Sequence, residues 1–331
     1  MKSSVSPIVV AFVLITFCIE PVLAQRSGGR PPARKHTVTS STGELKLQPS
    51  NSYAPDQSMV IINQMVDKRV IRSNGIPKHK VGRFPNSGNP NAIQAQKYAE
   101  AMPIKPKTQS MSSPLPRGPF GFAVNGVPFD PGAAEWYQGV RSSTWQYEAL
   151  SGAVPLGLDT NHGHVQPTGA YHYHGLPTGL LKSLKVTKGE HSPIVGWAAD
   201  GFPIYAMYGY SSPDDPNSAV IELSSSYVLK SGNRPGGNNT PDGKYDGTFV
   251  GDYEFKKGNG HLDDCNGRFC VTPDFPNGTY AYFLTQSWPV IPRRFKGIPN
   301  EGVQHVSPNN PPPRRGDDRR PPPHHRRPPP R

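Results

Sequence analysis

The sequence lacks the features that would assign it to several common protein classes. Only three cysteines occur among 331 residues, which is too few for a four-cysteine metal site. After the first two dozen residues no stretch is apolar and long enough to cross a bilayer, and we predict no transmembrane span. His-Glu-x-x-His, Gly-x-Ser-x-Gly and phosphate-cradling motifs are absent, and no residue stands out as a nucleophile. The sequence therefore leaves open whether the protein is an enzyme.

The net positive charge is small outside the two ends of the chain. The net charge is +12, but residues 26–35 contribute four positive charges and residues 308–331 contribute a net five. The body between them carries only +3. A nearly balanced body does not resemble a nucleic-acid-binding surface, so we predict no nucleic-acid partner.

The N-terminus has the pattern of a secretory signal peptide. Lys2 precedes an apolar run from Ile8 to Ile19, which is too short to span a membrane, and Val22-Leu23-Ala24 offers residues small enough for the cleavage positions. We therefore predict that residues 1–24 are removed and that the protein is secreted and extracellular. Asn238 and Asn277 each begin an Asn-x-Thr sequence, the acceptor pattern for N-glycosylation in a eukaryotic secreted protein.

Removal of the signal peptide leaves one pair of cysteines, Cys265 and Cys270. An even number of cysteines in an exported chain predicts a disulfide. The bond would close a short loop and contribute about 2 kcal/mol.

Both flanking segments are unsuited to a packed core. The tail, residues 307–331, consists mainly of proline and arginine, so we predict a disordered chain with polyproline II character. Its expected partners are anionic extracellular surfaces or polysaccharides. The tripeptide Arg315-Gly316-Asp317 matches an integrin-type adhesion motif, a pattern that also arises by chance. Residues 25–58 are similarly polar, and we predict that they form a flexible segment.

Histidines cluster in the middle of the chain. Four of the eleven fall within thirteen residues, in His162-Gly163-His164 and His172-Tyr173-His174. Pro167 and Gly169 predict a three-residue hairpin loop between the pairs. Centring this loop on residue 168 places residue 164 opposite 172 and residue 162 opposite 174. All four imidazoles then share one face of the hairpin, and Val165, Tyr171 and Tyr173 share the other.

Clustered neutral imidazoles are suited to binding a metal ion such as copper or zinc. Four histidines on one flat ribbon do not easily reach tetrahedral geometry, so two or three would ligate. Asp159, Asp200 and His191 are then candidates for additional ligands or for orienting the rings. The alternative is a structural cluster, in which histidines and tyrosines line a polar sheet face, and Asp200-Gly201 is a turn signal in its own right.

Residues 59–306 are predicted to form a single, mainly β domain of sandwich or barrel type with one or two short helices. Short apolar runs alternate with turns, and no long βαβ unit is visible. The expected strands are 120–124, 194–198, 204–208, 219–223 and 280–285. A helix is expected over residues 91–102, ended by Pro103, and a helical turn over 132–137.

Several blocks of the chain resemble one known family. Gly169-Ala-Tyr-His-Tyr-His-Gly-Leu-Pro177 is similar to the motif of the YHYH protein family, and similar blocks follow the same order across residues 70–300. The others are 122–131, 197–205, 264–270 and 277–283. The resemblance implies a mostly exported domain without a settled activity, and only the histidine motif is carried over as a site.

Two kinds of function fit these observations. The first is a secreted metal-binding domain of unknown activity. The second is a non-enzymatic matrix protein, associated with a mineral or acting in adhesion, that is tethered by its basic tail. Metal content distinguishes the two.

Overall fold

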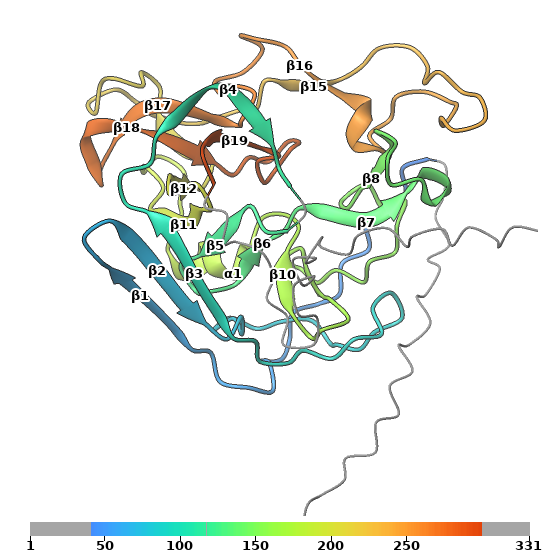
Figure 1. Cartoon of the computed structure of the whole chain (residues 1–331), viewed down its shortest axis with the longest axis horizontal. Helices are drawn as coiled ribbons and strands as arrows, with labels where there is room; N and C mark the ends of the chain where they lie inside the picture. The colour runs from blue at the N-terminus through green and yellow to red at the C-terminus, as the bar shows by residue number, and fades with distance from the viewer. Residues whose placement is uncertain (1–40, 117, 300–331) are drawn as a thin grey trace, which may run out of the picture. The chain divides into compact units, whose positions relative to one another are not determined.

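Short strands separated by turns carry most of the regular structure, as predicted (Figure 1). The computed structural model describes residues 41–116 and 118–299. The predicted signal peptide, residues 25–40, the Arg/Pro tail and Arg315-Gly316-Asp317 lie outside the described residues. Within the described ranges no helix is long and apolar enough to cross a membrane.

The largest sheet has eight strands and mixed parallel and antiparallel pairing. Its edge at β9 carries the histidine hairpin. The spatial order is β17 (Gly267–Thr272), β18 (Phe275–Phe283), β12 (Pro203–Tyr205), β11 (Ile194–Ala198), β5 (Gly121–Ala123), β6 (Pro128–Phe129), β10 (Tyr171–Tyr173) and β9 (Gly163–Val165).

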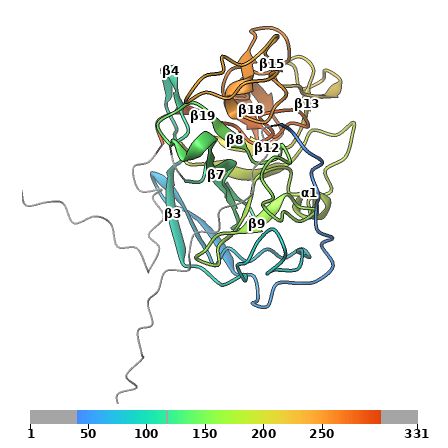
Figure 2. The same cartoon turned by 90° about the vertical axis from the view of Figure 1, so that its right-hand side faces the viewer.

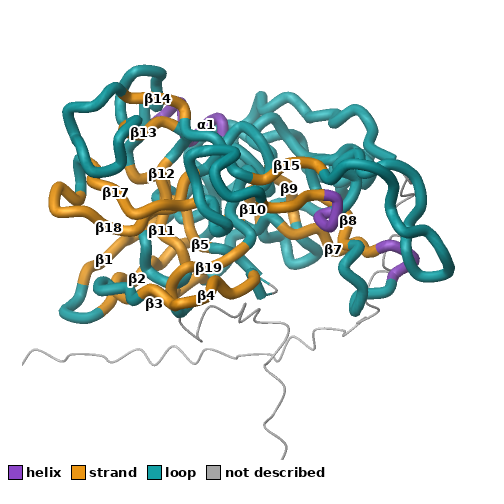
Figure 3. Tube along the Cα trace, turned by 90° about the horizontal axis from the view of Figure 1, so that it is seen from above, coloured by secondary structure: helices purple, strands orange, loops and turns teal. Residues whose placement is uncertain are grey.

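Smaller sheets and long loops complete the fold (Figure 3). A three-stranded antiparallel sheet contains β1 (Val60–Gln64), β2 (Lys68–Ser73) and β3 (Tyr98–Pro103). The two-stranded sheets pair β4 (Thr108–Pro114) with β19 (Arg294–Gly297), β7 (Gly132–Trp136) with β8 (Gln146–Glu148), β13 (Tyr208–Tyr210) with β14 (Val220–Glu222), and β15 (Tyr227–Leu229) with β16 (Tyr253–Phe255). None of these sheets closes on itself, so the described domain is mainly β but is not a closed barrel.

The helical content is small, but it lies elsewhere than predicted. The α-helix α1 (Thr178–Ser183) follows the histidine hairpin (Figure 2), and single 3-10 turns occur at η1 (Tyr137–Gly139) and η2 (Val250–Asp252). The helix predicted over 91–102 is wrong, because residues 98–103 pair with β2 through long-range backbone hydrogen bonds that override local propensity. The helical turn predicted over 132–137 is instead strand β7.

Buried aromatic and aliphatic side chains form one main core and smaller clusters. The main core joins β10 to the centre of the large sheet through Tyr173, Phe129, Ile204 and Tyr282. A second cluster surrounds Phe249. Three residues of the histidine hairpin, Val165, Tyr171 and Tyr173, belong to the main core.

The polar segment before the domain is partly built into it. Gly43 donates a backbone hydrogen bond to Ser151, and Gln48 donates one to Leu158. Leu45 and Leu47 pack against the second cluster. Part of the predicted flexible segment 25–58 is therefore hydrogen-bonded to the domain and packed against it.

Candidate metal centre

The histidine hairpin forms with the predicted loop and register. His164 lies opposite His172, and Val165 lies opposite Tyr171. Gln166 donates a backbone hydrogen bond of 2.9 Å to Ala170. Gly169 adopts the left-handed conformation, with φ of +84°, which glycine takes at little cost.

The tyrosines of the motif hold the hairpin in the main core, on the face predicted for them. Tyr171 and Tyr173 are almost fully buried with Val165. The Tyr171 hydroxyl donates a 2.8 Å hydrogen bond to Asp159. The Tyr173 hydroxyl contacts Asn125 at 2.9 Å and His79 at 2.6 Å. The motif therefore alternates between anchoring residues and histidines.

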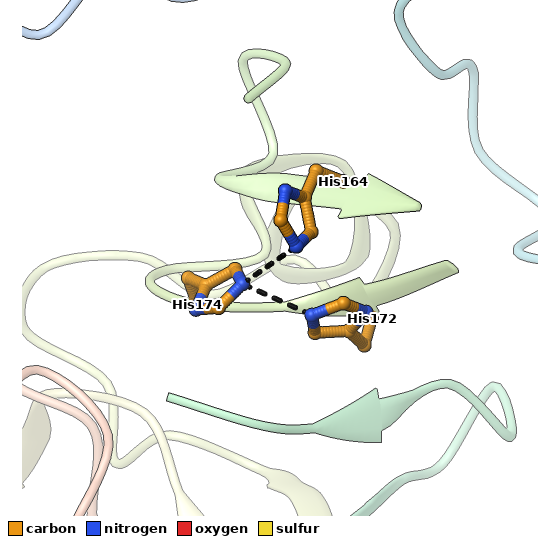
Figure 4. A group of neighbouring side chains, drawn as sticks. All are labelled: His164, His172 and His174. Carbon is orange, nitrogen blue, oxygen red and sulfur yellow. Dashed lines mark hydrogen bonds between the residues drawn. The ribbon is translucent and has the colours of Figure 1, made fainter. Parts of the chain in front are cut away.

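Three of the four predicted histidines converge (Figure 4). Nε2 of His174 lies 2.9 Å from Nε2 of His172 and 3.1 Å from Nε2 of His164. All three groups fall within 4.8 Å of one another. His172 and His174 are buried, and His164 is half-buried. The arrangement presents three imidazole nitrogens to a common point.

Backbone carbonyls set the orientation of two rings. Nδ1 of His164 lies 3.0 Å from the Leu156 oxygen, and Nδ1 of His172 lies 3.3 Å from the Ala170 oxygen. A carbonyl only accepts hydrogen bonds, so Nδ1 carries the proton in both rings and Nε2 carries the lone pair in the neutral form. This tautomer directs the metal-binding nitrogen of each ring into the cluster.

Burial keeps the third ring neutral. The pKa of His174 lies well below its ordinary value, first because of desolvation and then because of the neighbouring His164 and His172. Nδ1 of His174 is buried without a well-aligned hydrogen bond among the described residues. The nearby Pro131 backbone raises the pKa of His174, but by less than desolvation lowers it. A neutral imidazole is the form that binds a metal ion.

The fourth histidine is not brought into the cluster, which corrects the prediction that all four rings share one face. His174 N still donates to the His162 oxygen at 2.8 Å, so the predicted pairing continues along the backbone. His162 itself has a left-handed backbone, with φ of +53°. This turns its ring away from strand geometry, and its Nδ1 contacts the Leu176 oxygen at 2.9 Å.

The three candidate supporting residues lie in other networks. Asp159 accepts hydrogen bonds from the Gly82 and Asn161 backbone amides and fixes the turn that precedes β9. Asp200 accepts from the Gly297 amide and the Tyr282 hydroxyl, and burial raises its pKa to about 6. His191 contacts the backbone of Ser192. None of the three belongs to the three-histidine group.

The predicted disulfide is also corrected. Cys265 and Cys270 are both free and buried. Cys265 packs in the main core, whereas Cys270 packs in a separate cluster with Tyr205 and Leu223. The structure therefore places the two thiols in different clusters of buried side chains. The two predicted glycosylation sites, Asn238 and Asn277, are exposed.

Residues beyond the motif shape the electrostatics of the cluster. Arg293 donates two hydrogen bonds to Glu148, at 2.8 and 2.9 Å, and Trp288 donates a third at 2.9 Å. The Arg293 charge contributes to the lowered pKa of His174. This contact was not predictable from the sequence, because Glu148 and Arg293 are 145 residues apart.

Comparison with known proteins agrees with the motif. The family model described as YHYH protein matches residues 99–297. The chain belongs to this family. The resemblance predicted from the sequence is thereby confirmed, and the matched range contains the hairpin, the core tyrosines and the three converging histidines of this YHYH protein. No curated protein and no solved structure gives a match.

Proposed function

We propose that this YHYH protein is a secreted domain that binds one zinc or copper ion through His164, His172 and His174. The observation that supports this proposal is the convergence of three Nε2 atoms on one point. Imidazole is a good ligand for both metals.

The contacts between the rings are difficult to satisfy without a cation. In the tautomer fixed by the carbonyls, Nε2 of His164 and of His172 both present a lone pair to His174. A single proton on His174 can point directly at only one of them. A shared metal ion satisfies all three nitrogens at once.

The distances are close to those of a metal site. A tetrahedral ion with metal–nitrogen bonds of about 2.0–2.1 Å holds its ligand nitrogens roughly 3.3–3.4 Å apart. The two short separations, 2.9 and 3.1 Å, require the rings to move apart by only a few tenths of an ångström. Three protein ligands leave a further coordination position for water or another molecule, which is the pattern of catalytic rather than structural zinc sites.

Metal analysis of protein purified without a histidine tag tests the proposal. We expect about one zinc or copper ion per chain, and none in the His172→Ala/His174→Ala variant. His162→Ala is the matched control, because it removes a histidine of the same motif whose ring lies outside the cluster. A folded wild-type protein that takes up neither metal would contradict the proposal, as would equal loss of metal in the control.

We further propose that the basic tail retains the secreted protein on anionic polysaccharide in an extracellular matrix. The support is compositional, since residues 308–331 contain seven arginines and two aspartates. Integrin binding through Arg315-Gly316-Asp317 is a narrower form of the same proposal. Deletion of residues 308–331 should abolish retention on heparin at low salt, because exposed charges interact most strongly there. Retention that survives the deletion would exclude a tether in this segment.

A further inference from the structure

The first hairpin presents an edge strand without the usual protection against pairing. β1 lies at one side of the three-stranded sheet and, within the described part of the chain, pairs only with β2 (Figure 1). The stretch 59–66 contains no charged residue and no proline. Edges without such residues readily pair with another strand. The opposite edge, β3, contains Glu100 and Pro103.

Apolar side chains on this hairpin are exposed to solvent. The exposed fraction is 51% for Ile61 and 38% for Ile62 on the strand, and 98% for Val66 in the turn. Met59 and Met65, at the two ends of the strand, are more than half exposed. Five of the eight residues 59–66 are therefore exposed apolar residues, and a partner strand at this edge would cover part of them.

The hydrogen-bond pattern shows which backbone groups face outward. Asn74 N donates to the Met59 oxygen, and Met65 N donates to the Lys68 oxygen. In an antiparallel pair, residues that exchange hydrogen bonds alternate with residues that do not. The odd-numbered residues of β1 therefore bond to β2. The N–H and C=O groups of Val60, Ile62 and Gln64 point toward the open edge.

We propose that this edge is the interface of a homodimer, in which β1 of two copies pairs antiparallel about a two-fold axis through Ile62. Val60 of each copy then lies opposite Gln64 of the other, and Ile62 lies opposite itself. This register pairs all the outward backbone groups of these three residues in both copies and joins two three-stranded sheets into one of six strands.

The side chains fit a second copy better than a charged partner. In this register the exposed Met59 meets Met65 of the other copy, and Ile61 meets Asn63. No like charges face each other, although each chain carries a net charge of +12. A two-fold interface needs a surface that is complementary to itself, and this strand satisfies that condition in backbone and side chains. Because the strand is short, the interface is small and the dimer should dissociate on dilution.

Sedimentation velocity of the full-length protein over a range of concentrations tests the dimer. We expect a monomer–dimer equilibrium that Ile62→Pro shifts at least tenfold toward the monomer. The proline removes an outward N–H and leaves the hydrogen bonds to β2 in place. Ile62→Lys serves the same purpose if the proline variant misfolds. Met111→Lys, an exposed apolar residue on β4, is the matched control and should leave the equilibrium unchanged.

Cross-linking tests the register. Ile62→Cys places the new thiol opposite its own copy, so mild oxidation should give a covalent dimer. Asn63→Cys places it opposite Ile61, and we expect little cross-linking. A monomer at all concentrations overturns the proposal, and so does a dimer that neither Ile62 substitution weakens. Equal cross-linking of both cysteine variants would overturn the register.

Discussion

Two clusters in this protein gather three potential metal ligands each, yet they differ in what those groups already do. His164, His172 and His174 turn their Nε2 atoms toward one another. In the second cluster, the ligand atoms of Asp263, Asp264 and Cys265 also lie within 4.8 Å of one another.

The groups of the second cluster are engaged in holding the fold. The Asp263 carboxylate accepts hydrogen bonds from the Tyr280 hydroxyl and from two backbone amides. Asp264 bonds to Ser112 and Arg294. Burial raises the pKa of Cys265 to about 12, so its thiol stays protonated. We therefore expect the second cluster to bind metal less well than the three histidines, because a metal ligand must be in the correct protonation state as well as close to the other ligands.

The sharpest test of this difference is stabilisation by added metal. Zinc or copper at a thousandfold excess over its dissociation constant should stabilise the wild-type protein by about 4 kcal/mol, because the ion binds the folded state. His174→Ala should abolish the effect, whereas Asp264→Asn should preserve it. Thermal unfolding with and without metal measures both. A stabilisation that depends on Asp264 would reverse the assignment of the two clusters.

The second cluster should matter for stability without metal. Asp263→Ala leaves the buried Tyr280 hydroxyl without its acceptor, and we expect a loss of roughly 3 kcal/mol. Denaturant unfolding of the metal-free protein measures the change. The same loss should appear with metal present, since this carboxylate is structural. A variant whose loss is recovered by adding metal would contradict that role.

Acid should destabilise the metal-free protein through the buried His174. The folded pKa of His174 lies below the unfolded value of 6.5, so the unfolded state binds more protons as the pH falls below about 6.5. Stability then decreases with falling pH, by at most about 1.4 kcal/mol per pH unit for this group.

The pKa values of Asp200 and Glu100 are raised, so these two carboxyl groups favour the folded state as the pH falls. The effect of His174 must therefore be measured against a variant that retains both carboxyl groups. His174→Gln should show a weaker loss on acidification than the wild type. If the free energy of unfolding falls by the same amount in both proteins between pH 7 and pH 5, His174 is not a buried neutral residue.

The smallest effect should come from reductant. Because Cys265 and Cys270 are free thiols in separate cores, a reducing agent should leave the unfolding temperature unchanged. Labelling after unfolding under non-reducing conditions should detect both thiols. A drop in stability on reduction would instead restore the disulfide predicted from the sequence.

The sequence predicted the parts of the site that depend on local chemistry. Pro167 and Gly169 defined the loop, and the two-residue alternation then defined the register of His164 with His172. The position of His162 was not predictable, because its left-handed backbone depends on a turn held by Asp159 through Tyr171 and distant Gly82. The helix expected over 91–102 failed for the same reason, since pairing with β2 is long-range.

The Tyr-His-Tyr-His alternation has a consequence for how this site can be altered. Strand side chains alternate between the two faces of a strand, so a shift of β10 by a single residue would exchange the faces that the tyrosines and the histidines occupy. One inserted residue in the Pro167–Gly169 loop would favour such a shift. The histidine cluster and the main core therefore depend on the same strand register, and a change in that register would alter both.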